Sequence, residues 1–302
     1  MPLNPQTAGL NEVIQAVRAT APPPTVATAR AGYQELIAQV GAASTVSSVE
    51  QLDVAGRPAL LVSPPERERG LLVWFHGGGW TINSPALSLT EVDRLAVAGR
   101  CRCLSVDYRL APEHPLPAAQ HDAIAAARWA IEHAPSLGAS PAGVAVGGDS
   151  AGGNLAAVAA QRVEGLCAQL LVYPSVDLRP ESVSTLPHLE GYALDGPTMT
   201  FFLDQALSGG ADPADPLLSP LLAPPTVLAA TPPALVITCE YDPIRDDGRR
   251  YAAALLAAGV EVEELRFDDE MHLFFSLPEV LDGAKRAIEA SGTFLAKRSA
   301  AA

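Results

Sequence analysis

Hydrophobic residues recur with one spacing near the start of the chain and with another further along. Between residues 4 and 40 they fall at i, i+3, i+4 and i+7, which predicts helices with one narrow apolar face. The prolines at 22–24 divide this stretch into two helices. From about residue 47 the period becomes two, which predicts short strands at 49–54 and 58–62. The two helices must therefore pack against another part of the molecule.

Continuous apolar runs alternate with helical patterns along the rest of the chain. The predicted strands are residues 71–75, 101–106, 144–146, 168–173, 234–239 and 260–267. The predicted helices are residues 87–98, 117–133, 154–162, 248–258 and 278–297. Strands that are apolar on both faces and alternate with helices indicate a mainly parallel sheet covered by helices. With the two earlier strands, the sequence predicts an α/β fold with an eight-stranded sheet.

Residues 175–231 interrupt this alternation. They are rich in proline and glycine and carry one short predicted helix, at 197–207. A plain loop of this length is uncommon in a compact domain. We therefore expect residues 1–46, which hold the N-terminal helices, and the inserted segment 175–231 to form a cap over an α/β domain that spans residues 47–302.

The composition narrows the classes of partner. Of the 302 residues 48% are hydrophobic, which is enough for a large core, and the formal net charge is −14. Nucleic acids and anionic membranes would repel such a surface, so neither is expected as a partner. The start of the chain has no basic segment followed by an apolar one, and no apolar run approaches the length of a membrane helix. These features favour a soluble, cytoplasmic protein without membrane insertion.

The four cysteines lie in or beside apolar runs, which is typical of buried thiols and not of a disulfide framework. Residues 101–103 read Cys-Arg-Cys, a spacing unsuited to a zinc site, and no cluster of cysteine and histidine lies nearby. We expect neither a metal ion nor a cofactor.

A serine lies where a predicted strand turns into a predicted helix. Residues 148–152 read Gly-Asp-Ser-Ala-Gly, which fits the pattern G-x-S-x-G. Small residues on both sides allow a strained turn that pushes the Ser150 hydroxyl out above the sheet. Glycine-rich turns of this kind also bind phosphate or only pack closely, so the motif alone does not define a nucleophile. A nucleophilic serine also needs a base and a group that orients the base.

His272 is the candidate base. It follows the last predicted strand, and loops at the carboxyl ends of parallel strands meet at one edge of the sheet, where Ser150 also lies. The other interpretation is a histidine half buried beside Phe274 and Phe275.

Asp242 is the candidate orienting acid. It comes directly after the seventh predicted strand, and Pro243 restricts its backbone to an extended conformation. Asp246 or Asp247 is expected to cap the helix that begins near Gly248. The order serine, aspartate, histidine along the chain agrees with this choice of acid.

Attack on an ester carbonyl creates an oxyanion, which needs preformed N–H donors. Residues 76–80 read His-Gly-Gly-Gly-Trp and follow the third predicted strand, and three glycines leave backbone N–H groups open to a ligand oxygen. The amide of Ala151, directly after the serine, would be the remaining donor. A flexible glycine loop without this role is the alternative.

Four motifs agree in order and spacing, and through them the chain resembles the hormone-sensitive lipase-like family of α/β-hydrolases, the bacterial family IV carboxylesterases. The motifs are His-Gly-Gly-Gly-Trp at 76–80, Asp-Tyr-Arg-Leu-Ala-Pro-Glu-His-Pro at 107–115, Gly-Asp-Ser-Ala-Gly-Gly at 148–153 and Asp-Pro-Ile-Arg-Asp at 242–246. The resemblance implies an α/β-hydrolase fold whose cap comes from the N-terminus and from the segment after the sixth strand.

Carried over to the matching positions, the resemblance implies roles for individual residues. The implied triad is Ser150 as nucleophile, His272 as base and Asp242 as acid. The implied oxyanion donors are Gly78, Gly79 and Ala151. The implied substrate contacts are Trp80, Tyr192, Phe201 and Leu273. The family has a glycine right after the catalytic histidine, whereas this chain has Leu273, which is expected to narrow the acyl pocket or to shift the imidazole.

The expected function is that of a serine esterase that cleaves short-chain acyl esters through an acyl-enzyme. Two alternatives remain open: hydrolysis of an amide, carbamate or lactone by the same residues, and a non-catalytic small-molecule binder on the same fold. The plant gibberellin receptors are such binders and lack the histidine that this chain keeps as His272. The expected partner is a small ester, and proteins of this architecture often form homodimers through edge strands or outer helices.

Overall fold

The computed structural model describes the chain except for residues 1, 21–22, 41–44, 183–190 and 301–302. Eight strands in the described residues form one sheet, as the sequence predicts. The strands are β1 Ser48–Val54, β2 Arg57–Ser63, β3 Leu71–Phe75, β4 Arg102–Val106, β5 Val144–Asp149, β6 Ala168–Val172, β7 Ala234–Tyr241 and β8 Val262–Met271. Their order in the sheet is β1-β2-β4-β3-β5-β6-β7-β8. Only the pairs β1–β2 and β2–β4 are antiparallel, so the prediction of a mostly parallel sheet is confirmed.

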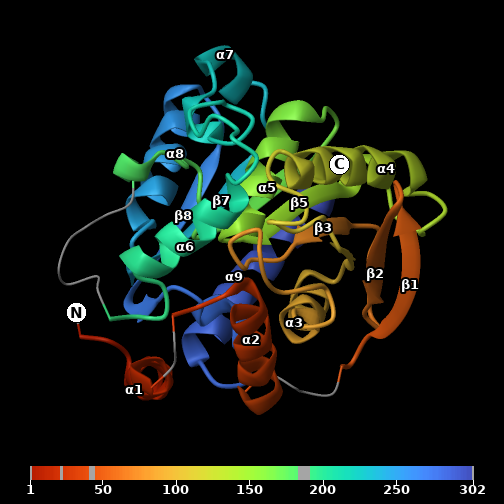
Figure 1. Cartoon of the computed structure of the whole chain (residues 1–302). Coiled ribbons are helices and arrows are strands. Elements are labelled where there is room, and N and C mark those ends of the chain that lie inside the picture. The colour runs from red at the N-terminus through yellow and green to blue at the C-terminus, as the bar shows by residue number, and fades with distance from the viewer. Residues whose placement is uncertain (1, 21–22, 41–44, 183–190, 301–302) are drawn as a thin grey trace.

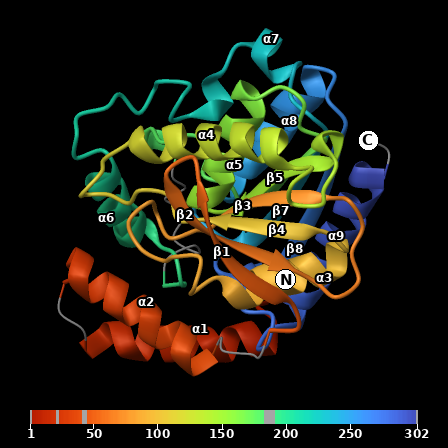
Figure 2. The same cartoon turned by 90° about the vertical axis from the view of Figure 1, so that its right-hand side faces the viewer.

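Helices cover both faces of the sheet (Figure 2). The central strands β3, β5 and β6 are buried along their whole length, which explains their continuous apolar runs. One core contains side chains of α4 Ala118–His133, α5 Ala151–Arg162 and α8 Arg245–Ala257. The other contains side chains of α3 Leu89–Gly99 and α9 Asp282–Ala300. The sheet thus holds the carboxyl ends of its parallel strands at one edge, where loops can carry a site.

Three further helices lie together on one side of the molecule, α1 Pro5–Thr20, α2 Val26–Val40 and α6 Gly196–Ala206 (Figures 1 and 2). Arg18 of α1 donates hydrogen bonds to the carbonyl of Tyr192, at 2.7 Å, and to the carboxylate of Asp195, which caps α6. Arg30 of α2 pairs with Glu113 at 2.7 Å. The contacts of Arg18 join α1 to the segment around α6, and the pair of Arg30 with Glu113 joins α2 to the loop between β4 and α4. Residues 183–190 of the predicted cap segment lie outside the described residues.

The loop after β7 corrects one prediction. Helix α8 begins at Arg245, and its N-cap is Ile244, so Asp246 and Asp247 lie in the first turn and do not cap the helix. The helix starts early because a carboxylate oxygen of Asp242 accepts a hydrogen bond from the Ile244 N–H at 2.9 Å. This bond turns the chain directly after the end of β7. Gly248 is an interior residue of the helix, where a Cβ atom would lie 2.7 Å from the methyl group of Thr238.

Strand β8 is also longer than predicted. It runs to Met271, whereas the sequence pattern ends at Phe267. After a shift of register, Tyr241 of β7 pairs with Met271, although Cys239 pairs with Phe267. The additional pairing brings the end of β8 level with the end of β7, so the residue after each strand lies at the same edge of the sheet.

Candidate active site

Ser150 lies in a strained turn between β5 and α5. Its backbone has φ 54° and ψ −117°, a conformation that a residue with a side chain rarely adopts, at a cost of about 1–3 kcal/mol. The flanking glycines make the turn feasible, since a Cβ atom at Gly152 would overlap the carbonyl oxygen of Phe75, and one at Gly148 would overlap the carbonyl oxygen of Gly152. The tight turn places the serine side chain at the tip, ahead of the N-terminus of α5.

The structure brings Ser150, His272 and Asp242 together. His272 Nε2 lies 2.9 Å from Ser150 Oγ, and His272 Nδ1 lies 2.9 Å from Asp242 Oδ2. An ionised carboxylate can only accept, so Nδ1 carries the proton and Nε2 is free to accept from the serine hydroxyl. Asp242 is fully buried and His272 is 7% exposed. The three side chains come from the ends of β7, β8 and β5, and their arrangement is that of a nucleophile, a base and an orienting acid.

Tyr173 is a neighbour of the histidine that sequence reasoning missed. Its ring lies against the His272 imidazole, with the centroids 4.3 Å apart. Burial raises the pKa of Tyr173 well above 10, and the nearby carboxylates of Asp149 and Glu91 raise it further, so the ring stays uncharged. The signal available in the sequence was an aromatic residue at the end of the sixth strand, directly before Pro174. The packing fixes one face of the imidazole.

The glycine loop after β3 offers backbone donors beside the serine. Gly78 and Gly79 have φ values of 114° and 56°, which favour glycine. Within the described part of the chain, no acceptor receives a hydrogen bond from the N–H of Gly78, Gly79 or Ala151. Three N–H groups without acceptors next to a nucleophile are what an oxyanion requires.

Two side chains hold the glycine loop in place. Asp149, which precedes the serine, accepts a hydrogen bond from the Gly77 N–H at 2.6 Å, and burial raises the pKa of its carboxyl to about 6. The His76 ring stacks on Tyr108 with centroids 4.4 Å apart, and its Nδ1–H donates to the Gly77 carbonyl at 2.7 Å. Burial lowers the pKa of His76 to about 4, so this imidazole is neutral at pH 7. His76 therefore supports the loop through its contacts with the Gly77 carbonyl and the Tyr108 ring.

The four predicted substrate contacts lie in different surroundings. Trp80 is 1% exposed and belongs to the core on the α4 side of the sheet. Tyr192 lies against Tyr241, with ring centroids 4.8 Å apart. Phe201 is half-buried on α6. Leu273 follows His272 with φ 85°, in the left-handed region that favours glycine. Contact of these four residues with substrate stays a prediction.

Phe202 is a second residue that sequence reasoning missed. Its ring covers Gly79, because a Cβ atom at Gly79 would overlap the Phe202 side chain. The ring of Phe201 meets that of Phe202 edge to face, at 5.5 Å. The sequence carried a signal, since Phe202 lies three residues after Met199, which is buried on the same helix.

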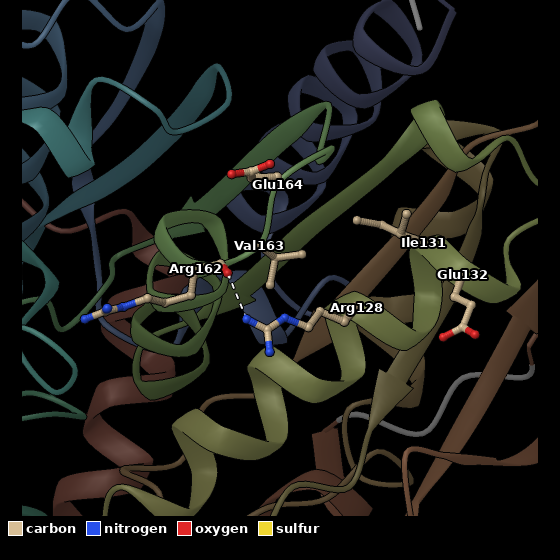
Figure 3. A pocket seen from close by; sticks show the side chains of 6 residues that line it. All are labelled: Arg128, Ile131, Glu132, Arg162, Val163 and Glu164. Carbon is tan, nitrogen blue, oxygen red and sulfur yellow. Dashed lines mark hydrogen bonds between the residues drawn. The ribbon is translucent and has the colours of Figure 1, made fainter.

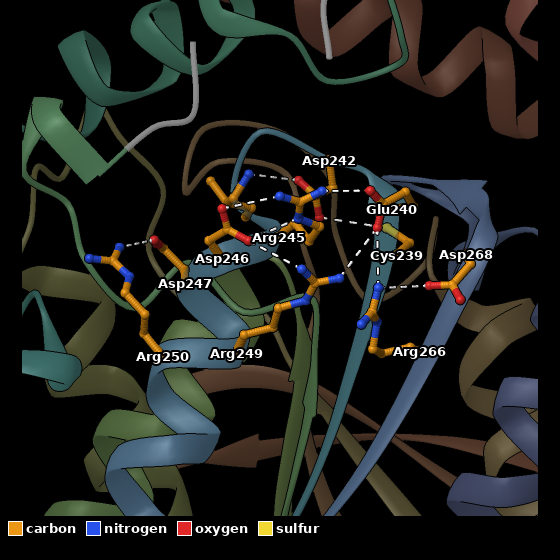
Figure 4. A network of polar contacts seen from close by, with 11 residues as sticks. Cys239, Glu240, Asp242, Arg245, Asp246, Asp247, Arg249, Arg250, Arg266 and Asp268 are labelled. Atoms are coloured by element: carbon orange, nitrogen blue, oxygen red, sulfur yellow. Dashed lines mark hydrogen bonds and ion pairs between the residues drawn. The ribbon is translucent and has the colours of Figure 1, made fainter. Parts of the chain in front are cut away.

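An ionic network lies on the outer side of the loop that carries Asp242 (Figure 4). Glu240 accepts hydrogen bonds from Arg245 at 2.6 Å, from Arg249 at 3.3 Å and from Arg266 at 3.4 Å. Arg245 also pairs with Asp246 at 2.9 Å. Since Arg245 and Arg249 belong to α8 and Arg266 to β8, the network fastens both elements to the end of β7.

A shallow surface hollow of about 420 Å³ lies elsewhere, between the ends of α4 and α5 (Figure 3). The residues that line it are Arg128, Ile131, Glu132, Arg162, Val163 and Glu164. Ser150 precedes the first residue of α5 and Arg162 is the last, so the helix separates the two by about 18 Å. The hollow is therefore distinct from the site around Ser150.

Among the described residues, no group of three or more histidine, cysteine, aspartate or glutamate side chains could hold a metal ion. Within the same ranges, no helix combines the length and apolar character that crossing a membrane demands.

Comparison with known proteins gives matches over most of the chain. Residues 72–276 match a family described by the alpha/beta hydrolase fold. The chain is 43% identical to the carboxylic ester hydrolase LipN of Mycobacterium tuberculosis over 232 residues, which cover 71% of this chain and 59% of LipN. It is 31% identical to an ethyl acetate hydrolase of Pseudomonas putida over 95% of this chain and 96% of that protein. A solved ester-hydrolase from the metagenome of Lake Arreo, complexed with a derivative of bipyridine phosphonate, superposes with a TM-score of 0.90 at 35% identity and covers 98% of both chains.

Proposed function

This chain belongs to the hormone-sensitive lipase-like carboxylesterases of the α/β-hydrolase superfamily, and we propose that it is a serine esterase acting on short-chain acyl esters. The observation that carries the proposal is the pair of 2.9 Å contacts that joins Ser150, His272 and Asp242. A small-molecule ester is the proposed substrate.

In the proposed reaction Ser150 Oγ attacks the ester carbonyl while His272 Nε2 takes the hydroxyl proton. Asp242 holds the imidazole tautomer and stabilises its positive charge. The N–H groups of Gly78, Gly79 and Ala151 receive the oxyanion of the tetrahedral intermediate. His272 then gives the proton to the leaving alcohol, and an acyl-enzyme on Ser150 results. Water, activated by the same imidazole, hydrolyses this intermediate and restores the serine.

Two bulky side chains support the preference for short acyl groups. Phe202 covers Gly79 of the proposed oxyanion loop, and Leu273 follows the proposed base directly. In the proposed site both would reduce the space for the acyl group. Because methylene groups that do not fit a pocket each cost about 1–3 kcal/mol, long chains would react slowly.

We also propose that residues 1–46 and 175–231 act as a cap over the α/β domain at 47–302, supported by the contacts of Arg18 with Tyr192 and Asp195. A homodimer through edge strands or outer helices is also part of the proposal, and β1 and β8 are the two edge strands of the sheet.

The decisive experiment compares Ser150→Ala with a control, Ser175→Ala. Ser175 is buried nearby, and its hydroxyl has no partner among the described residues. On p-nitrophenyl butyrate, Ser150→Ala should lower kcat about a thousandfold or more, whereas the control should retain activity. Circular dichroism checks that both variants fold. Near-normal hydrolysis by Ser150→Ala would exclude this serine as the nucleophile.

Two measurements separate the alternatives. An organophosphonate should label wild-type Ser150 in a 1:1 ratio, and a binder with an unreactive serine would not be labelled. A panel of esters from acetate to decanoate, with the matching amides and lactones, tests the bond and the chain length. Faster turnover of an amide or lactone than of the matched ester would replace the esterase assignment.

A further inference from the structure

Cys239 lies beside the carboxylate of Asp242. It belongs to β7, three residues before Asp242, and its side chain is 1% exposed. Its Sγ lies 3.6 Å from Asp242 Oδ2, within the range for a hydrogen bond from sulfur. The same oxygen is the partner of His272 Nδ1. Figure 4 shows Cys239 on the strand next to Glu240, close to Asp242.

The thiol can only be a donor in this contact. Burial raises the pKa of the Cys239 thiol well above its usual value, and the carboxylates of Asp242, Glu270 and Glu240 raise it further. The sulfur therefore keeps its proton across the working pH range. An ionised carboxylate has no proton to give, so the S–H group points to the oxygen.

We infer that Cys239 is a positioning residue of the proposed triad: its thiol donates to Asp242 Oδ2 and tunes the basicity of His272. The inference rests on the proposed function. The carboxylate is held at three points, by the thiol and the imidazole on Oδ2 and by the Ile244 N–H on Oδ1. A carboxylate whose charge is shared with an additional donor stabilises the imidazolium less. Cys239 thus keeps the proton affinity of His272 lower than Asp242 alone would set it.

Replacing Cys239 leaves the other titratable groups around Asp242 and His272 unsubstituted. Those nearest are Asp149 of β5, Glu240 of β7 and Glu270 of β8, with the uncharged Tyr173 against the imidazole. Glu240 is engaged by three arginines, and Glu270 accepts a hydrogen bond from Thr7 of α1. A shift seen on replacing Cys239 therefore reports the lost thiol.

The test measures kcat/KM against pH for wild type, Cys239→Ala and Cys239→Ser. The acid limb of the kcat/KM profile reports the pKa of the base in the free enzyme. Removing the donor in Cys239→Ala should move the acid limb up by about half a pH unit. Cys239→Ser replaces the sulfur with a smaller oxygen but keeps an O–H donor, so its limb should lie closer to that of the wild type. The C–O bond is shorter than the C–S bond, so recovery is partial.

The results distinguish the role of Cys239 from the proposed function itself. An acid limb in Cys239→Ala equal to that of the wild type overturns the inference, and so does an equal shift in the alanine and serine variants, because the shift would then not depend on a hydrogen-bond donor at this position. Ser150→Ala is assayed alongside: if it stays active, the proposed function fails, whereas an inactive Ser150→Ala with an unmoved Cys239→Ala limb defeats only the role of Cys239.

A second measurement needs no variant of Cys239 to fold. The S–H stretching band of a thiol falls in frequency when it donates to a charged acceptor. The infrared difference between wild type and Asp242→Ala should therefore show one S–H band that moves to higher frequency in the variant. The absence of such a band would contradict the contact.

Discussion

Leu273 occupies a backbone conformation that suits glycine, and exchanging it should reverse the usual order of stability between glycine and alanine. The residue has φ 85° and ψ −17° and lies directly after His272. We compare Leu273→Gly with Leu273→Ala. Both variants lose the part of the leucine side chain that packs, partly buried, against the core on the α9 side of the sheet.

The magnitude follows from two opposing terms. A residue with a Cβ atom in the left-handed region costs about 1–2 kcal/mol, and glycine escapes this cost. Glycine has more freedom in the unfolded chain, which favours alanine by about 0.4–1 kcal/mol. The difference leaves Leu273→Gly more stable than Leu273→Ala by about 0.5–1 kcal/mol, although it has the smaller side chain.

Urea denaturation followed by circular dichroism measures the free energy of unfolding of each variant. Leu256, 49% exposed on α8, supplies the control pair, because there alanine should exceed glycine by about 1 kcal/mol. Opposite orders at the two sites would support the reasoning. If Leu273→Ala is as stable as Leu273→Gly or more stable, the claim of backbone strain at this position is refuted.

Three further predictions concern the turn, the buried acid and the acyl wall. Gly152→Ala should destabilise the fold by about 3 kcal/mol or more, because the new methyl group would overlap the carbonyl oxygen of Phe75. Gly32→Ala is the control and should not destabilise the fold, because no non-neighbouring atom lies within 4 Å of a Cβ at that position. Thermal denaturation compares the stability of the two variants. Burial raises the pKa of Asp247 from 3.8 to about 7, so between these values the folded state holds a proton that the unfolded state has released, and stability falls as pH rises. Asp247→Asn should remove this slope of up to about 1.4 kcal/mol per pH unit, and an unchanged slope in urea titrations would count against it. Phe202→Ala should raise kcat/KM for octanoate relative to butyrate about tenfold, and a larger gain in Phe201→Ala would identify Phe201 as the wall.

The sequence predicted those parts of the site that depend on chain order and strand direction. Ser150, Asp242 and His272 each follow a parallel strand, and the common edge of such strands brings them together whatever the details of packing. The eight strands of the sheet were predicted from their apolar runs, which depend only on the local sequence.

Features set by contacts between distant side chains escaped prediction. Tyr173 reaches His272 only because its strand neighbours β7, and Phe202 reaches Gly79 only because α6 packs over the glycine loop. A local feature also escaped prediction: the early start of α8 depends on a hydrogen bond from the Ile244 N–H to the Asp242 carboxylate two residues away, and no periodicity encodes it. The same holds for the register shift that extends β8 to Met271.

The crowding around Gly148 and Gly152 has a practical consequence for anyone who wishes to redirect this chain to new substrates. The turn that carries Ser150 has no room for a Cβ atom at Gly148 or Gly152. Random libraries that include residues 148–152 will therefore consist largely of misfolded protein. Substitutions are better placed at the exposed positions of α1 and α6, which lie outside the turn that carries Ser150.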